Sequence, residues 1–322
     1  MKNLRVVFMG TPEFAVASLG ALLINGYDVV SVVTSQDKPA GRGLKISASA
    51  VKDFADSSYL PVIQPDNLKD PEFITRLKGL NPDIFVIVAF RMLPEDVWKI
   101  PPLGTINLHA SLLPQYRGAA PINHVIINGE TITGVTTFLI DDKIDTGNIL
   151  LREEVPILPS DNAGDLHDRL MRYGAQLVVR TLDGMVRNEL RPQPQTNFMH
   201  PGELLHKAPR IFPEECLIDW EKNPAEIHNF IRGLSPHPCA RSIFKNSIRS
   251  FSFKIFESSP ENTAHTFTPG QVLSDGKNFI TIACNGGFVN ILNLQLEGRR
   301  RMSCQEFLRG FAIKEFSKEA IS

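Results

Sequence analysis

The sequence predicts an α/β fold whose first part is a doubly wound, mostly parallel sheet, followed by a small antiparallel β-barrel. Two observations predict the sheet: short apolar runs recur from Leu4 to Leu108, and helical stretches separate them. One observation predicts the barrel. Between Ser242 and Asn293 several short strand patterns follow one another, separated by turn-forming Asn, Gly, Pro and Asp residues.

The first predicted strand is Leu4–Met9, a continuous apolar run typical of a strand buried on both faces. Gly10-Thr11-Pro12 then turns the chain into a helix, and Thr11 is expected to be its N-cap. Further strands are predicted at Asp28–Thr34, Pro61–Gln64, Ile84–Ala89 and Thr105–Leu108. In such a sheet, ligands bind outside the carboxyl ends of the strands, where His109 falls.

Residues 189–208 contain several prolines and show no sustained periodicity. This composition predicts a linker between a catalytic domain at 1–188 and a second domain at 209–322. Within the second domain, a helix is expected at Pro224–Gly233, before the strands of the barrel.

The composition is that of an ordinary globular protein, with 43% apolar and 21% charged residues and a net charge of -1. The four cysteines are widely spaced and suggest neither a zinc site nor a disulfide framework. No apolar run is long enough to span a bilayer or to form the core of a signal peptide. We therefore expect a cytoplasmic protein without a metal and without a membrane partner.

A dinucleotide-binding enzyme is the first alternative for such a sheet. The turn after the first strand reads Gly10-Thr-Pro-Glu-Phe-Ala15 and lacks the second and third glycines that let a pyrophosphate approach the helix. We therefore expect no NAD at this turn.

Asn107 and His109 stand at the end of a predicted strand, and residues two apart in a strand point to the same face. A carbonyl attacked by an amine develops negative charge on its oxygen, and amide and imidazole donors stabilise that charge. Asp145, in Ile144-Asp145-Thr146-Gly147, would orient the imidazole and hold its charge. Such a pair also fits a turn without catalytic function, but the neighbouring Leu112-Leu113-Pro114 turn favours a site.

The pattern Asn107-x-His109-x-Ser111-Leu-Leu-Pro114-x-x-Arg117-Gly118 with Asp145-Thr-Gly resembles the active-site signature of the folate-dependent formyltransferases. The resemblance covers nearly the whole chain and is widest with the members that formylate methionyl-initiator tRNA. It is carried by Phe8-Met-Gly10-Thr-Pro-Glu-Phe14, Asp37-Lys-Pro39-Ala-Gly41-Arg42-Gly43, Gly118-Ala-Ala-Pro121-Ile, Ile218-Asp219-Trp220 and Ile231-Arg232-Gly-Leu-Ser-Pro236. It implies a Rossmann-like formyltransferase domain followed by an OB-like barrel.

The resemblance also implies an activity. The formyl group of 10-formyltetrahydrofolate would pass to the α-amino group of methionine on initiator tRNA, through a tetrahedral intermediate, with Asn107, His109 and Asp145 as the catalytic residues. The expected folate-binding residues are Ser111, Leu112, Leu113, Pro114, Phe90, Arg91 and Asp141. For Asp141 a plain turn role is an equal alternative.

A long loop, Ser35–Ser47, carries Lys38, Arg42 and Lys45 interleaved with glycine and proline. Its composition fits a solvated, mobile surface loop as well as a functional one. In the functional interpretation the three cations reach phosphates or unpaired bases at the end of an RNA acceptor stem. The resemblance implies that this loop and the barrel bind initiator tRNA, and we expect a monomer.

Four other functions remain alternatives. A formyltransferase acting on a nucleotide-linked amino sugar and a formyltetrahydrofolate hydrolase would use the same three polar residues, but neither needs this version of the basic loop. A glycinamide ribonucleotide formyltransferase needs no barrel domain. An RNA-binding module without catalysis would have no reason to keep Asn107, His109 and Asp145 beside the Ser111–Pro114 turn.

Overall fold

The computed structural model describes residues 2–40, 45–245 and 250–311. The chain forms two compact units. The first consists of Met1–Gly118, Ile132–Pro156 and His167–Lys207, and the second of Ala119–Thr131, Ile157–Leu166 and Ala208–Ser322. The predicted division at residues 188 and 208 stays a prediction. Among the described residues, no helix is both long enough and apolar enough to cross a bilayer.

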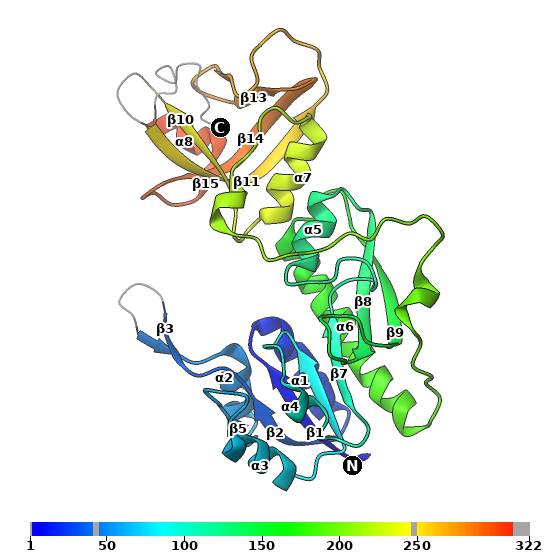
Figure 1. Ribbon diagram of the computed structural model, residues 1–322. Coiled ribbons are helices and arrows are strands. Elements are labelled where there is room, and N and C mark those ends of the chain that lie inside the picture. The colour runs from blue at the N-terminus through cyan, green and yellow to red at the C-terminus, as the bar shows by residue number, and fades with distance from the viewer. Residues whose placement is uncertain (1, 41–44, 246–249, 312–322) are drawn as a thin grey trace. The chain divides into compact units, whose positions relative to one another are not determined.

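A seven-stranded sheet forms the centre of the first unit, in the order β5-β2-β1-β6-β7-β8-β9 (Figure 1). The first five of these strands pair in parallel, as the apolar runs predicted, whereas β8 and β9 are antiparallel. The mostly parallel α/β fold is thereby confirmed. The strands are β1 (Lys2–Gly10), β2 (Tyr27–Val33), β5 (Val62–Ile63), β6 (Ile84–Val88), β7 (Thr105–His109), β8 (Ile132–Leu139) and β9 (Ile149–Pro156).

The helices associated with this sheet are α1 (Glu13–Ile24), α2 (Ala50–Ser57), α3 (Pro71–Gly79), α4 (Glu95–Trp98) and most of α6 (Ala163–Val186). The predicted N-cap of α1 was wrong: Pro12 occupies that position, and no side chain caps the helix. Thr11 lies one residue too early because it belongs to the connection, where its carbonyl accepts a hydrogen bond from Val51 N–H.

Helix α6 packs against one face of β7. A Cβ at Gly174 of α6 would come within 2.7 Å of Leu108 Cδ2, so the helix lies close to the strand at this point and a larger residue would displace the Leu108 side chain. Because side chains alternate along a strand, Asn107 and His109 lie on the opposite face from Leu108. The face that carries the two polar residues is therefore not the one that α6 covers.

The loop after β2 contains a small hairpin, with β3 (Lys38–Ala40) antiparallel to β4 (Lys45–Ser47), which projects from the sheet (Figure 1). Its base is held by Asp37, whose carboxylate accepts hydrogen bonds from Lys52 Nζ at 2.6 Å and Gln64 Nε2 at 2.8 Å. These bonds, led by that from Lys52, hold the pKa of Asp37 below its usual range. The sequence did not predict this pairing, and the strands and the polar base together order the two ends of the loop.

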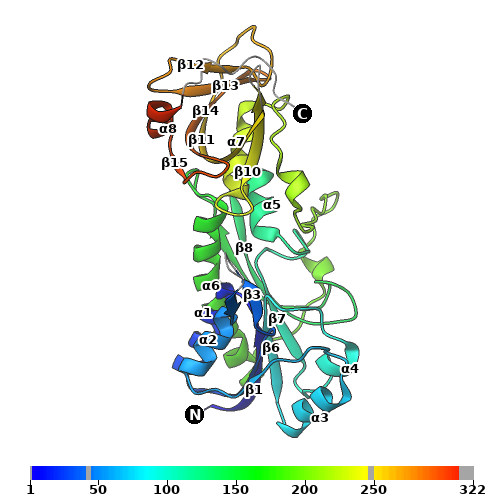
Figure 2. The ribbon, with the colours of Figure 1, turned by 90° about the vertical axis from the view of Figure 1, so that its left-hand side faces the viewer.

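The second unit is built on an antiparallel sheet in the order β10-β11-β14-β13-β12, with β15 paired to β14. Figure 2 shows this sheet curling on itself, which confirms the predicted antiparallel C-terminal fold. Its elements are α5 (Pro121–Ile127), η2 (Pro213–Cys216), α7 (Pro224–Leu234), β10 (Ala240–Lys245), β11 (Ser250–Glu261), β12 (Val272–Ser274), β13 (Ile280–Cys284), β14 (Gly287–Leu296), β15 (Met302–Ser303) and α8 (Cys304–Gly310).

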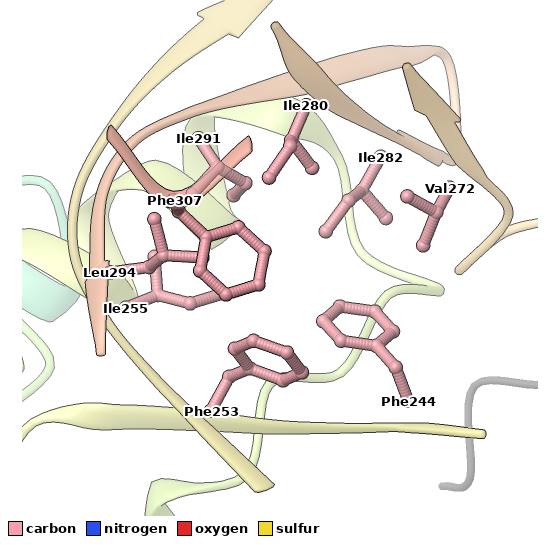
Figure 3. Close-up of a pocket in the computed structure, with 9 residues that line it drawn as sticks. All are labelled: Phe244, Phe253, Ile255, Val272, Ile280, Ile282, Ile291, Leu294 and Phe307. Atoms are coloured by element: carbon pink, nitrogen blue, oxygen red, sulfur yellow. The ribbon is translucent and has the colours of Figure 1, made fainter. Parts of the chain in front are cut away.

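A cavity lies inside the curled sheet (Figure 3). Its empty space is about 330 Å³, part of it open to solvent, and all nine lining side chains are apolar. They are Phe244, Phe253, Ile255, Val272, Ile280, Ile282, Ile291, Leu294 and Phe307. A wall without acids, bases or hydrogen-bond donors has no means of activating a substrate, so this cavity is part of the core of the second unit.

Candidate active site

His109 is the last residue of β7, and only 6% of its surface is exposed. Its Nε2 lies 2.9 Å from the carbonyl oxygen of Tyr116, and its Nδ1 lies 3.8 Å from Oδ2 of Asp145. A carbonyl oxygen can only accept a hydrogen bond, so Nε2 must carry a proton. The Tyr116 carbonyl therefore fixes the ring so that Nδ1 faces the carboxylate.

Asp145 belongs to a tight turn between β8 and β9. Its φ of 55° lies in the left-handed region, which residues other than glycine rarely adopt. Its Oδ2 accepts a hydrogen bond from Gly118 N–H at 3.0 Å. A Cβ on Gly147 would lie 1.6 Å from the carbonyl oxygen of Leu139, so the turn requires glycine at this position. The polypeptide backbone is thus forced to present the Asp145 carboxylate toward His109.

Asn107 lies in the middle of β7, half-buried, between Ile87 of β6 and Phe138 of β8. It stands two residues before His109, so both side chains project from the same face of the sheet. Its side-chain amide makes no hydrogen bond to any other residue that the structure describes. An amide with unused donors beside an imidazole can bind an oxygen that gains negative charge.

The turn that follows His109 is held by Thr136 of β8, which is fully buried. Its hydroxyl donates to the carbonyl of Ser111 at 2.6 Å and accepts from Leu113 N–H at 3.2 Å. Ser111 Oγ in turn donates to the carbonyl of Gln115 at 2.6 Å. Leu113 and Pro114 are buried as well, and Leu112 is half-buried. The segment expected to line a folate pocket is therefore rigidly attached to the sheet.

The other residues expected at the folate pocket occupy two loops. Arg91 donates to the carbonyls of Pro65 and Asp66, and its guanidinium carbon lies 5.5 Å from the centre of the Phe90 ring. Asp141 Oδ1 accepts hydrogen bonds from the Thr146 hydroxyl and from Lys143 N–H. Asp141 therefore has a role in the turn, and its contact with a folate stays a prediction.

Of the three cations expected at an RNA contact, Lys38 and Lys45 belong to the strands of the hairpin. Lys38 of β3 is exposed. Lys45 belongs to β4, but its side chain is outside the described part of the structure. Arg42 lies outside the described residues altogether.

Comparison with known proteins places the chain in a family. Residues 3–182 match the formyl transferase family, and residues 210–312 match the formyl transferase C-terminal domain. The chain is 49% identical over 318 residues to the methionyl-tRNA formyltransferase of Bacteroides fragilis, covering 98% of both chains. It is 50% identical over 318 residues to that of Flavobacterium johnsoniae, covering 99% of both. The chain belongs to the methionyl-tRNA formyltransferase family. The resemblance seen in the sequence is thereby confirmed.

Solved structures share the fold of this formyltransferase at low sequence identity. The sugar 3N-formyl transferase WlaRD, solved in the presence of dTDP and 5-N-formyl-THF, superposes with a TM-score of 0.65 at 23% identity, over 92% of this chain and 99% of its own. Glycinamide ribonucleotide transformylase 1 from Symbiobacterium toebii gives a TM-score of 0.51 at 17% identity, over 59% of this chain and 94% of its own.

Two polar residues at this site were not found from the sequence. Thr136 is one of several threonines in an apolar strand, and Gln195 lies in the proline-rich stretch Pro192-Gln-Pro194-Gln195. Neither belongs to a recognisable spacing pattern, because their partners come from distant segments of the chain. Only the fold of this formyltransferase identifies them.

Proposed function

We propose that this protein transfers the formyl group of 10-formyltetrahydrofolate to the α-amino group of methionyl-initiator tRNA. The family membership supports formyl transfer, and the names of the relatives support the tRNA acceptor. The observation that carries the proposed chemistry is the placement of His109 Nδ1 at 3.8 Å from Asp145, on the sheet face that also carries Asn107. The folate ligand in the WlaRD structure supports the formyl donor.

The reaction needs little help to generate its nucleophile. An α-amino group has a pKa near 8, so roughly a tenth of it is neutral at pH 7, and deprotonation costs about 1 kcal/mol. The amine nitrogen attacks the formyl carbon, and the carbonyl π electrons move onto the formyl oxygen. The Asn107 amide then donates to that oxyanion, an interaction that contributes on the order of 10²- to 10³-fold in rate.

Protons must move twice during the reaction. The attacking nitrogen loses a proton, and N10 of tetrahydrofolate gains one when its bond to the formyl carbon breaks. We assign this transfer to His109 through Nδ1, with Asp145 holding the positive charge on the ring, a contribution of about 10²- to 10⁴-fold. The Tyr116 carbonyl leaves Nδ1 as the ring nitrogen available for this exchange.

Kinetics of point variants test these roles. Asn107→Ala and Asp145→Asn should each lower kcat at least about 100-fold while the KM values for tRNA and folate change little, because the lost interactions act in the transition state. Asn25→Ala, at the exposed end of α1, is the control and should leave kcat unchanged. An Asn107→Ala protein with wild-type turnover would remove Asn107 from the mechanism.

A competition between acceptors tests the substrate. Charged initiator tRNA, charged elongator tRNA, a nucleotide-linked amino sugar and water are offered together with 10-formyltetrahydrofolate. Preferential formylation of charged initiator tRNA supports the proposal. Faster transfer to the sugar or to water would favour one of the two alternative activities.

We assign tRNA contacts to Lys38, Arg42 and Lys45 of the segment Ser35–Ser47 and to the curled sheet of the second unit. Arg42→Ala should lower kcat/KM for tRNA at low salt. In a plot of log kcat/KM against the logarithm of the salt concentration, the slope should become shallower by about one, because one phosphate contact is lost. Arg76→Ala, in the last turn of α3, is the matched control. A loss that does not depend on salt would contradict a phosphate contact.

The proposal also includes the oligomeric state and the location of the protein: a monomer that acts in the cytoplasm, where initiator tRNA is charged.

A further inference from the structure

One buried amide connects the segments that form the candidate site. Gln195 begins the short helix η1 (Gln195–Phe198) and is 5% exposed. Its Nε2 donates to the carbonyls of Asp145 at 2.8 Å and Gly147 at 2.9 Å, while its Oε1 accepts from Nε and Nη2 of Arg117 at 3.0 and 2.5 Å. Both N–H donors and the acceptor oxygen are used. Since carbonyls only accept and guanidinium only donates, the amide can face only one way.

These bonds act on the strained part of the site. A residue other than glycine held in the left-handed region costs on the order of 1–3 kcal/mol and keeps that conformation only if its surroundings enforce it. Gln195 holds the main chain on both sides of Thr146, whereas Gly118 N–H holds the Asp145 carboxylate itself. Because Arg117 directly precedes Gly118, one amide fixes both the turn and the segment that supplies this N–H.

We propose that Gln195 is a positioning residue for Asp145, which keeps the carboxylate at 3.8 Å from His109 Nδ1 without touching the substrate. The inference rests on the proposed function, since it assigns Gln195 to the catalytic step. A misplacement of about 1 Å at a reacting group lowers rates up to about 100-fold. Loss of Gln195 should therefore act on turnover.

The chain segment around Gln195 has other attachments to the first unit. Gln193 and Ile149 exchange backbone hydrogen bonds of 2.9 and 2.8 Å. Farther along, the Gln115 side chain bonds to Glu203, to the carbonyl of Leu204 and to the N–H of His206. Removal of the Gln195 amide thus leaves the segment attached at both ends. Its particular effect is to release the Asp145 turn.

Two variants at position 195 separate its contacts. Gln195→Leu removes all four hydrogen bonds, and we expect kcat to fall about 10- to 100-fold with the KM values for tRNA and folate within about threefold of wild type. Gln195→Glu keeps an oxygen for Arg117 but loses both N–H donors, so its kcat should fall as far. Wild-type kcat in Gln195→Glu would overturn the proposal, and this readout remains if Gln195→Leu fails to fold.

Glu203→Ala is the matched control, because it removes hydrogen bonds of the same segment, from the Gln115 side chain and from His200 N–H, without touching the Asp145 turn. At a comparable loss of Tm, it should retain kcat within about threefold. An equal fall of kcat in Glu203→Ala and Gln195→Leu would mean a general structural effect and would overturn the proposal.

A double-mutant cycle gives the decisive readout. In the Asp145→Asn background, Gln195→Leu should lower kcat by less than about twofold, because the carboxylate that it positions is gone. Multiplicative losses would show that Gln195 acts elsewhere. If Asp145→Asn alone keeps wild-type kcat, the proposed mechanism fails. If Asp145→Asn loses activity but Gln195→Leu does not, only the role of Gln195 fails.

Discussion

Thr136→Val tests how the fold supports the site. The side chain of Thr136 is fully buried in β8, and valine replaces its hydroxyl with a methyl of nearly the same volume. The substitution removes the donor to the Ser111 carbonyl and the acceptor for Leu113 N–H. It therefore perturbs polar pairing and leaves packing almost unchanged.

The magnitude follows from the two groups left without a partner. Ser111 and Leu113 are both fully buried, so water cannot replace the lost hydroxyl. Each unsatisfied buried backbone group costs about 1–3 kcal/mol, and the first unit should lose about 2–6 kcal/mol of its free energy of unfolding. Under the proposed function the loosened turn should also raise the KM for 10-formyltetrahydrofolate.

Thr137→Val is the matched control, one residue along the same strand and equally buried. The Thr137 hydroxyl bonds to that of Thr181, which itself donates to the carbonyl of Leu177. Loss of the Thr137 hydroxyl therefore leaves no backbone group without its hydrogen-bond partner. The free energy of unfolding should therefore fall by only about 1 kcal/mol.

The assay is urea unfolding followed by tryptophan fluorescence in a Trp220→Phe background. The chain has two tryptophans, and Trp98 then reports on the first unit alone. Equal losses of stability for Thr136→Val and Thr137→Val would refute the reasoning, because the backbone groups at 111 and 113 would have found other partners.

Three further predictions concern other parts of the molecule. Gly147→Ala should lower the free energy of unfolding of the first unit by about 3 kcal/mol or more, measured in the same urea assay, because its Cβ overlaps the Leu139 carbonyl. Ile282 is fully buried beside the cavity of the second unit. Ile282→Ala should lower the free energy of unfolding of this unit by about 2–5 kcal/mol, measured by urea unfolding with Trp220 fluorescence as the probe. Burial lowers the pKa of His228 below 6.5. As the pH falls, His228 therefore takes up its proton in the unfolded chain before it does so in the folded chain. The free energy of unfolding should drop below about pH 6.5 in wild type and drop less in His228→Gln. Equal pH profiles of the urea midpoints of the two proteins would contradict this.

The apolar runs of the sequence predicted β1, β2, β5, β6 and β7 because burial on both faces of a parallel strand demands continuous apolar residues. Apolar runs did not predict β8 and β9, because Gly134, Arg152 and two glutamates interrupt the apolar residues of these strands. Their antiparallel pairing depends on contacts with β7, which a local pattern does not contain. The hairpin β3–β4 was missed for a related reason, since its base depends on Lys52 and Gln64 outside the loop.

The sequence by itself determined that Asn107 and His109 share a face, because alternation along a strand is a local property of the backbone. The sequence also offered Asp145 as a candidate partner for the imidazole, and family resemblance supported it. Only the tertiary structure decided the distance from His109 to Asp145, the strained turn that creates it, and the Gln195 amide that holds this turn from 50 residues away. Hydrogen bonds between distant segments form when the whole chain has packed, and local spacing carries no record of them.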